Sequence, residues 1–384
     1  QVGRELHAGK LKANYMGQRM GQGGLADPGN VLDQQVAARE QAGHTVLNAG
    51  ALAHDHRVKL IQYGLDFLRR LHDATLSEIL RRGDKAMGKT GYFSHRDCWL
   101  HEMGPGHPEC PERLDAIEDR LLVTGVIDAL ERFEAPQAAL ADIELAHGRL
   151  HIAAMRGLTD WLREEVEAGG PAHTQVDPDT SMNVHTWNAA LRSAGAALAA
   201  TDAVMAGELE NAFCAVRPPG HHAMRDKAMG FCFFNNVAVA AKYALQRYNL
   251  QRVAVVDFDV HHGNGTEDIL AGDERALMVS FFQHPFYPYS GDQAPAANMV
   301  NIPVAAYTRG MDIREVIEMM WIPRLEAFKP EMIFISAGFD AHRDDDMGQL
   351  GLTEQDYTWI TQRIKDVARR FCNGRIVSCL EGGY

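Results

Sequence analysis

The sequence is poor in the features that mark disulfide-bonded, membrane-spanning or nucleic-acid-binding proteins. Its six cysteines form no CxxC pair, and a chain of this length needs no disulfides, so we expect a reducing compartment, the cytoplasm. No apolar run approaches the ~18 residues of a membrane span. Lys and Arg number 38 against 51 Asp and Glu, a net charge of −13, which argues against direct binding to nucleic acid and favours a basic ligand.

What the sequence does contain is enough apolar residues for a large core: 46% of its 384 residues are hydrophobic. Residues 1–86 differ from the rest, because they begin with little periodicity and then, from Val31 to Arg82, follow a helical pattern without any chemistry-bearing motif. We therefore predict a helical or poorly ordered extension of unknown role over 1–86 and a catalytic domain over 87–384.

Within the predicted catalytic domain, short β-rich runs alternate with helical stretches. Continuous apolar strands separated by helices are typical of a parallel sheet that is buried on both faces. Two of the helices are expected to stop at Gly125 and Gly207. The sequence thus predicts a three-layer α/β fold with a mostly parallel central sheet and helices on both faces. The predicted strands are 89–94, 211–216, 252–260, 276–281, 331–338 and 375–380.

Ionisable or hydrogen-bonding side chains accompany the ends of four of these strands. In open α/β sheets, ligands bind outside the carboxyl ends of the strands. Any one such residue could be an ordinary structural histidine or a turn-capping aspartate, but agreement among four strands is difficult to explain by packing. The side chains are His221 and His222 after 211–216, Asp257, Asp259 and His261 around the end of 252–260, Asp340 after 331–338, and Tyr384 after 375–380.

The spacing of these residues predicts a metal site. Residues two apart on a strand face the same way, so Asp257, Asp259 and His261 would line one face in a row, with His262 pointing to the other face. Asp259 and His261 are placed to bind one ion, and Asp340 can supply a third ligand. Two carboxylates and one imidazole with an open position suit catalytic zinc, and the same set could hold Fe²⁺. Asp257 lies deeper and is better placed to orient a histidine.

Several stretches resemble the zinc-dependent histone deacetylase family, and most of all its bacterial, class II-like members. The resemblance covers roughly 89–384 and does not reach 1–86. It implies the arginase/deacetylase fold and hydrolysis of an acyl-amide by metal-activated water. The stretches are "SHRDCWLHEMGPGHPECPERLDAI", "RPPGHHA", "MGFCFFNNVAVAA", "VVDFDVHHGNGTEDIL", "SAGFDAHRDDDMGQLGLTEQDY" and "EGGY".

The same resemblance implies the roles of the site residues. It makes Asp259, His261 and Asp340 the zinc ligands. It makes His222 the general base and acid, and Tyr384 the donor to the oxyanion, with zinc polarising the amide carbonyl. The supporting catalytic residues would be His221 beside His222, Asp257 paired with His221, and Asn264 paired with His222, where class I enzymes have Asp.

A substrate tunnel and a second ion are implied as well. Gly230 and Phe231 would line the acyl-lysine tunnel. Tyr287 would stand on the opposite wall, where the family usually has Phe, which makes the tunnel slightly more polar. Met347 would stand where polyamine-selective relatives carry an acidic gatekeeper. A structural potassium ion would be bound, mainly through main-chain oxygens, by Asp257, Asp259, His261, Ser280 and Phe281.

Other functions remain open at this point. Because Met347 is apolar, we expect acetyl-lysine substrates in proteins or peptides, with acetylated polyamines or other small amides as the alternative. An arginase-like two-metal hydrolase would need an acid where Gly263 stands, and a binding module that only reads acyl groups would not need intact catalytic positions; both are disfavoured. A homo-oligomer stays possible.

Two smaller expectations concern the C-terminal part of the sequence. Since the family continues beyond the tyrosine that matches Tyr384, we expect the sequence to be incomplete there. The three acids at 344–346 are interpreted as a solvated loop.

Overall fold

A computed structural model describes residues 89–293 and 296–384 of the chain, so the extension predicted over 1–86 lies outside the described residues. The centre is an eight-stranded sheet in which every neighbouring pair is parallel. In spatial order its strands are β2 (Leu130–Glu134), β1 (Thr90–Ser94), β5 (Asn211–Cys214), β10 (Ile376–Leu380), β9 (Met332–Ala337), β6 (Val253–Asp257), β7 (Ala276–Gln283) and β8 (Met299–Val304).

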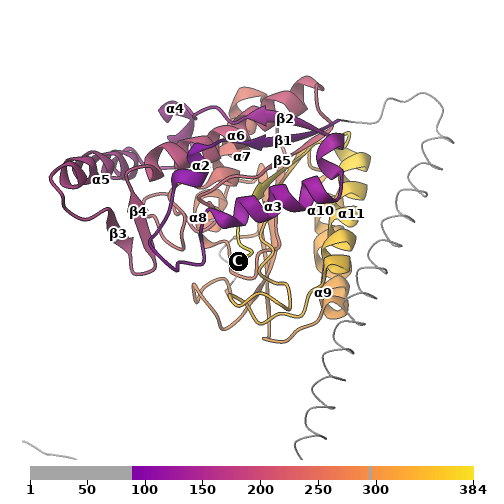
Figure 1. Cartoon of the computed structure of the whole chain (residues 1–384). Coiled ribbons are helices and arrows are strands. Elements are labelled where there is room, and N and C mark those ends of the chain that lie inside the picture. The colour runs from indigo at the N-terminus through magenta and orange to yellow at the C-terminus, as the bar shows by residue number, and fades with distance from the viewer. Residues whose placement is uncertain (1–88, 294–295) are drawn as a thin grey trace, which may run out of the picture. The chain divides into compact units, whose positions relative to one another are not determined.

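Side-chain alternation along the strands divides the core into two layers, one on each face of the sheet. On β6, Val253 and Val255 belong to one hydrophobic cluster, and Ala254 and Val256 belong to the other. The first cluster contains α6 (Thr186–Ala206) and α7 (Asn236–Arg247), and the second contains α9 (Gly310–Val316), α10 (Ile322–Phe328) and α11 (Glu354–Phe371). Figure 1 shows these two helical groups on either side of the sheet. The predicted three-layer α/β fold is therefore confirmed.

The remaining elements are short or peripheral. The predicted helix ends hold, because Gly125 and Gly207 follow α3 and α6 with φ of 70° and 75°, a left-handed conformation that favours glycine. None of the described helices is long and apolar enough to cross a membrane. The other elements are α2 (Asp97–Leu100), α3 (Glu112–Val123), a 3₁₀ turn (Val126–Ala129), α4 (Leu140–Ile143), α5 (Arg149–Glu167), the antiparallel hairpin β3 (His173–Asp177) and β4 (Thr180–Asn183), α8 (Asn264–Leu270) and a π-helical segment (Ile317–Trp321).

All six predicted strands are present, but the sheet has two more that the sequence did not reveal. β2 is an edge strand with the sequence LERFE, whose charged residues hide its apolar content, and β8 reads MVNIPV, with a proline inside it. Both lie at the edges of the sheet, where polar residues and proline are tolerated because one side of the strand needs no partner.

Two predicted strands are too long: β5 ends at Cys214 rather than at residue 216, and the correction to β6 bears on the site. β6 ends at Asp257 rather than at residue 260, so Asp259 and His261 lie beyond the strand. The carboxylate of Asp257 accepts the backbone N–H of Asp259 at 3.1 Å, and that of Asp259 accepts the N–H of His261 at 2.9 Å. Aspartate side chains bonded to the backbone two residues on form Asx-turns. Two such turns, and not strand pleating, keep alternate residues on one side.

The four strands that carry the predicted site residues are neighbours in the middle of the sheet, in the order β5, β10, β9, β6. All are parallel, so their carboxyl ends meet at one edge. This adjacency explains why segments more than a hundred residues apart in the chain deliver their side chains to one place.

Candidate active site

Three buried side chains converge at the carboxyl ends of β6 and β9. Nδ1 of His261 lies 3.0 Å from Oδ1 of Asp259 and 3.2 Å from Oδ2 of Asp340. One ligand atom of each residue lies within 4.8 Å of the other two. The Oδ1 of Asp340 accepts the backbone N–H of Val260 at 2.8 Å, which fixes the carboxylate against the loop that carries His261. The structure thus brings the three predicted ligands together.

The environment of this triad fits a divalent metal ion. Oδ2 of Asp340 is buried and, apart from its 3.2 Å approach to His261, meets no hydrogen-bond donor among the described residues, an arrangement that a bound cation would satisfy. Burial lowers the pKa of His261, but the carboxylates of Asp259 and Asp340 outweigh it and raise that pKa to about 10, so the site attracts positive charge. A Cβ at Gly338 or Gly382 would overlap these carboxylates. Two carboxylate oxygens and one imidazole nitrogen are a donor set that zinc and iron accept.

A pair of histidines lies beside the triad. Their rings are 4.0 Å apart between centroids, and each is bonded to a different partner. Nδ1 of His221 lies 3.1 Å from Oδ2 of Asp257, and Nδ1 of His222 lies 2.7 Å from Oδ1 of Asn264. Because the amide oxygen of Asn264 can only accept, Nδ1 of His222 donates and its Nε2 is left to accept a proton.

The two histidines differ in charge. Burial lowers the pKa of His221, but Asp259 and Asp257 raise it well above its usual range. Burial lowers the pKa of His222 well below its usual range, and the neighbouring His221 and His261 lower it further. His222 is therefore neutral at neutral pH, the state that a general base requires. The next histidine, His262, is turned away and bonds Ser290 at 2.8 Å, in agreement with its predicted structural role.

Tyr384 is presented to the same cavity by the loop that follows β10. Its backbone N–H donates to Asp345 at 2.7 Å, and the guanidinium of Arg113 lies 4.5 Å from its ring centroid while Nε donates to the carbonyl of Gly383 at 2.6 Å. Burial raises the pKa of Tyr384 well above its usual range, so its hydroxyl keeps its proton and can donate a hydrogen bond.

The sequence interpretation missed both contacts to the tyrosine loop. Asp344 and Asp346 are exposed in a loop, as predicted, but Asp345 is half-buried and its carboxylate accepts the N–H groups of Tyr384 and of Met347, at 2.7 and 2.8 Å. Arg113 belongs to the stretch "HPECPERLDAI", but no spacing in the sequence indicates that it bonds Gly383. Its bond to Gly383 joins residues 270 positions apart, which no local pattern predicts.

The histidine pair, His261 and Tyr384 line one cavity of about 270 Å³. Its aromatic contacts are close: the Tyr287 ring stands edge-on to His222 at 5.2 Å, Phe286 stacks on His261 at 5.5 Å, and Phe231 meets Tyr384 at 5.9 Å. A side chain at Gly230 would overlap the ring of His222. The cavity is lined by all four predicted tunnel residues (Gly230, Phe231, Tyr287 and Met347), by His221, His222, His261 and Tyr384, and by Asp179, Pro219, Phe286, Asp346 and Gly382.

The predicted potassium residues are all buried. Asp257 and Ser280 are register partners on β6 and β7, and Phe281 follows Ser280. Asp257, Ser280 and Phe281 are each at most 1% exposed. The burial of these residues on β6 and β7 is compatible with a structural potassium ion, which stays a prediction.

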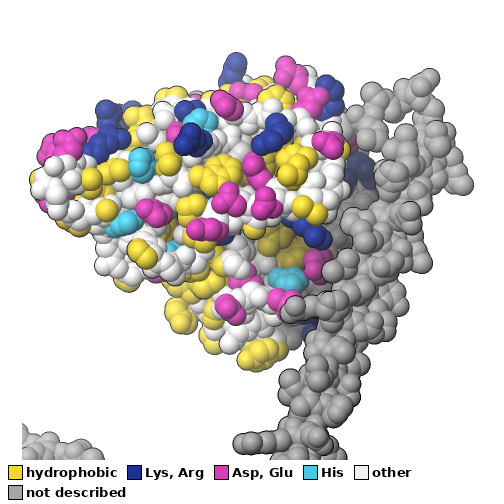
Figure 2. Space-filling view, in the orientation of Figure 1, with side chains coloured by type: hydrophobic (Ala, Val, Ile, Leu, Met, Phe, Trp, Pro, Cys, Tyr) yellow, Lys and Arg dark blue, Asp and Glu magenta, His cyan; other side chains and the backbone are white. Residues whose placement is uncertain are grey.

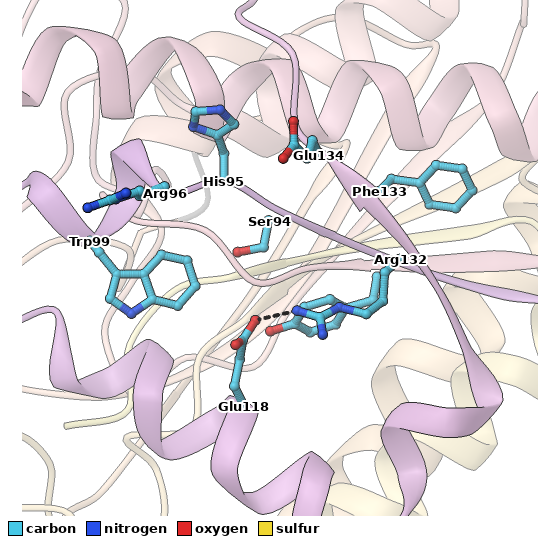
Figure 3. A pocket seen from close by; sticks show the side chains of 9 residues that line it. Ser94, His95, Arg96, Trp99, Glu118, Arg132, Phe133 and Glu134 are labelled. Carbon is cyan, nitrogen blue, oxygen red and sulfur yellow. Dashed lines mark hydrogen bonds and ion pairs between the residues drawn. The ribbon is translucent and has the colours of Figure 1, made fainter.

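A second cavity, of about 440 Å³, lies elsewhere, at the β1–β2 edge of the sheet (Figure 3). Trp99 lies on one side of it and Phe133 on the other, and Glu118 and Arg132 form an ion pair of 3.1 Å across it. Its lining contains none of the residues that the sequence predicted for the site, and the pairing of its charges leaves no convergent set of metal ligands or nucleophiles.

A parallel α/β sheet with an acid–histidine–acid triad, a histidine pair and a tyrosine at its carboxyl edge defines a class of metal-dependent hydrolases. The comparisons with known proteins agree. The family model described as "Histone deacetylase domain" matches residues 107–384. The solved structure described as "HDA15 HD domain" superimposes with a TM-score of 0.71 at 32% identity, over 78% of this chain and 85% of that one. The chain belongs to the histone deacetylase family and is a hydrolase of that family.

Individual relatives differ in how much of them the chain spans. The "Histone deacetylase-like amidohydrolase" of Pseudomonas aeruginosa is 34% identical over 77% of this chain and 82% of that protein. "Type-2 histone deacetylase 2" of Dictyostelium discoideum is 45% identical over 54% of this chain but only 13% of that protein. "Polyamine deacetylase HDAC10" of Mus musculus is 37% identical over 72% of this chain and 42% of that protein.

Proposed function

We propose that the protein is a zinc-dependent deacetylase that hydrolyses acetylated lysine side chains in proteins or peptides. The observation that carries the proposal is the meeting of three groups at one cavity: the Asp259–His261–Asp340 triad, whose His261 lines the cavity, a neutral His222 with a free Nε2, and the hydroxyl-bearing Tyr384. These are the ligand set, the base and the oxyanion donor that hydrolysis of an amide requires.

The proposed mechanism assigns a proton or a hydrogen bond to each residue. Asp259, His261 and Asp340 would hold the zinc ion, which would supply Lewis acidity at the amide carbonyl and at water. His222 accepts a proton from the attacking water at Nε2 and later gives it to the leaving amine. Asn264 holds the ring so that Nε2 faces the reaction, and burial together with the neighbouring His221 and His261 keeps the pKa of His222 low. Tyr384 donates to the carbonyl oxygen as that atom gains negative charge.

The shape of the cavity supports an acyl-lysine substrate. Its volume of about 270 Å³ lies at or below the lower end of the usual range for small-molecule sites, and aromatic rings form its walls. A linear chain of four methylenes ending in an amide suits a small cavity with aromatic walls, and Met347 adds an apolar side chain to its lining.

A second candidate substrate is an acetylated polyamine or another small acetylated amine. Two carboxylates, Asp179 and Asp346, line the cavity together with Met347, and a relative is named a polyamine deacetylase. Comparing kcat/KM for N-acetylspermidine with that for an acetyl-lysine peptide separates the two. Preference for the peptide supports the first candidate, and preference for the polyamine replaces it with the second.

The experiment that tests the proposed function combines metal analysis with a panel of acyl peptides on the purified full chain. We expect zinc to support turnover, with Fe²⁺ as the alternative metal, and His222→Ala to keep the metal and lose most turnover. A zinc-loaded protein that hydrolyses no acyl-amide would contradict the proposal. A full rate for His222→Ala would remove the role assigned to this histidine.

We also propose a structural potassium ion, bound near the paired residues Asp257 on β6 and Ser280 on β7.

The last proposals concern the cellular compartment and the partners. All six cysteines are free thiols, which supports a reducing compartment, the cytoplasm. Figure 2 shows acidic and basic side chains interspersed over one face, without a single basic patch, which agrees with acetylated proteins, peptides or amines as partners rather than nucleic acid.

A further inference from the structure

Glu381 is a buried carboxylate that the proposed mechanism does not use. It is the first residue after β10, is fully buried, and stands three residues before Tyr384. Its Oε2 accepts two backbone N–H groups, that of Gly220 at 2.6 Å and that of His221 at 3.0 Å. Burying a carboxylate costs several kcal/mol unless hydrogen bonds offset it, so a role for these two bonds is expected.

The two donors belong to the turn that delivers the histidine pair. Pro218 and Pro219 precede them and have no N–H, so Gly220 and His221 supply the first backbone donors of the turn. A Cβ at Gly220 would fall 2.5 Å from the backbone nitrogen of Asn236, so the turn packs tightly on its other side. The carboxylate of Glu381 therefore fixes the point at which the chain enters His221 and His222.

The backbone around Glu381 is held just as firmly. Its N–H donates to the carbonyl of Ala337 at 3.1 Å, and its own carbonyl accepts a hydrogen bond from Arg113. The next N–H, that of Gly382, donates to Oδ2 of Asp259 at 2.9 Å. Glu381 therefore cannot follow the histidine turn if the turn shifts, and it joins that turn to the tyrosine loop and to the metal triad.

We infer that Glu381 is a positioning residue that fixes the histidine pair relative to Tyr384. The inference rests on the proposed function, because it concerns the distance between the base and the oxyanion donor of that reaction. A displacement of about 1 Å between reacting groups can cost on the order of 100-fold in rate. One side-chain oxygen that accepts two consecutive backbone N–H groups fixes the turn at two points, which suits Glu381 to this task.

The chain offers a matched control at the opposite end of the sheet. Oε2 of Glu331, just before β9, also accepts the N–H groups of two consecutive residues, Gln251 at 2.6 Å and Arg252 at 2.9 Å. Glu331→Ala removes the same kind of bonds far from the site. Glu381→Gln keeps an oxygen that can accept both N–H groups, and Glu381→Ala keeps none.

The test measures kcat and KM of the zinc-loaded full chain on an acetyl-lysine peptide. We expect Glu381→Ala to lower kcat about 10- to 100-fold with KM within about twofold. We expect Glu381→Gln to stay within about fivefold of the wild type, and Glu331→Ala within about twofold. A wild-type kcat in Glu381→Ala, or an equal loss in Glu381→Gln, overturns the inference. If Glu381→Ala does not fold, Glu381→Asp, whose carboxylate is one methylene short, must show the loss of kcat instead.

A second readout does not depend on the proposed function. In protein labelled with ¹⁵N-histidine, the backbone amide of His221 should resonate downfield, because it donates to the buried side-chain oxygen of Glu381. We expect this shift to remain in large part in Glu381→Gln and to be lost in Glu381→Ala. An unchanged His221 amide in Glu381→Ala overturns the inference even if the wild type hydrolyses no acyl-amide, whereas a lost shift beside an inactive wild type would count against the proposed function alone.

Discussion

Nδ1 of His222 donates to the side-chain oxygen of Asn264 over 2.7 Å, and no carboxylate takes that place. The neighbouring histidine has the opposite arrangement, with Asp257 at 3.1 Å. An amide orients the ring without adding a negative charge, so burial and the neighbouring histidines hold the pKa of His222 well below its usual range. The pair thus combines a neutral base with a charged partner.

Replacing this amide by a carboxylate should shift the pH dependence of the enzyme. In Asn264→Asp the negative charge favours the protonated form of His222 and raises its pKa, typically by 1–3 units for a charge at this range. Because only neutral His222 can act as base, we expect the acid limb of the kcat/KM profile to move to higher pH. The profile of Asn373→Asp, at an exposed turn far from the site, should match the wild type. An unmoved acid limb in Asn264→Asp would show that His222 is not the titrating base.

Removing only the hydroxyl of Tyr384 should separate catalysis from folding. In Tyr384→Phe the ring keeps its contacts with Arg113 and Phe231, so we expect Tm and zinc content to be unchanged. Losing one oxyanion donor typically lowers kcat by about 100- to 1000-fold. Steady-state kinetics beside thermal melts checks both halves, and a kcat within tenfold of the wild type would assign the oxyanion to other donors.

The apolar side chain at Met347 should set the preference between peptide and polyamine. In Met347→Glu a carboxylate would face the second ammonium group of an acetylated polyamine. A partly exposed ion pair contributes on the order of 1 kcal/mol, or about fivefold. We therefore expect the ratio of kcat/KM for N-acetylspermidine over the acetyl-lysine peptide to rise about fivefold, and to stay constant in Met311→Glu, whose side chain is 82% exposed on α9. An unchanged ratio in Met347→Glu would place polyamine recognition elsewhere.

A buried ion pair behind the site should dominate the stability of this region. Both oxygens of Glu109 accept hydrogen bonds from Arg217, and both side chains are fully buried. Breaking such a pair leaves an uncompensated charge, so we expect Glu109→Ala to lower the free energy of unfolding by about 3–5 kcal/mol. Glu131→Ala, which removes an exposed partner of Lys89, should cost less than about 1 kcal/mol. Urea denaturation measures both, and equal costs would contradict the account.

The same pair predicts how stability depends on pH. Burial raises the pKa of Glu109, but Arg217 and His101 outweigh it and hold that pKa well below its usual range. A carboxyl with a depressed folded pKa contributes its stability above the unfolded pKa, about 4.3, and loses it as the pH falls toward the folded value. The difference in stability between wild type and Glu109→Ala should therefore be constant from pH 7 to about 5 and shrink below that. A difference that grows on acidification would contradict this assignment.

Much of the fold and the site could be predicted from local patterns. The apolar strands and their polar ends placed His222, Asp340 and Tyr384 correctly, because residues after parallel strands must gather at one edge. The spacing of Asp259 and His261 also gave the right pairing, although the cause is a pair of Asx-turns rather than strand pleating. Alternate residues stay on one side in both geometries, so the pattern succeeded for a different physical reason.

What the sequence could not reveal depends on contacts between distant segments. Arg113 reaches Gly383 across 270 positions, and Glu381 reaches Gly220 across 161. No periodic pattern in the sequence indicates either bond, and a charged residue that is buried looks the same in sequence as one that is exposed. The bond from Asp345 to the tyrosine loop escaped notice for a related reason, since three consecutive acids usually mark a solvated loop, and Asp344 and Asp346 are indeed exposed. Edge strands β2 and β8 escaped because charged residues and proline interrupt their apolar pattern.

The central claim is that a single metal ion, held by Asp259, His261 and Asp340, supports hydrolysis. The most direct test is to add zinc stepwise to metal-free protein and to measure acetate release from an acetyl-lysine peptide at each step. We expect turnover to rise linearly and to saturate at one zinc per chain, with no turnover in Asp340→Asn. Saturation at two metal ions per chain, or turnover that does not depend on metal, would contradict the account.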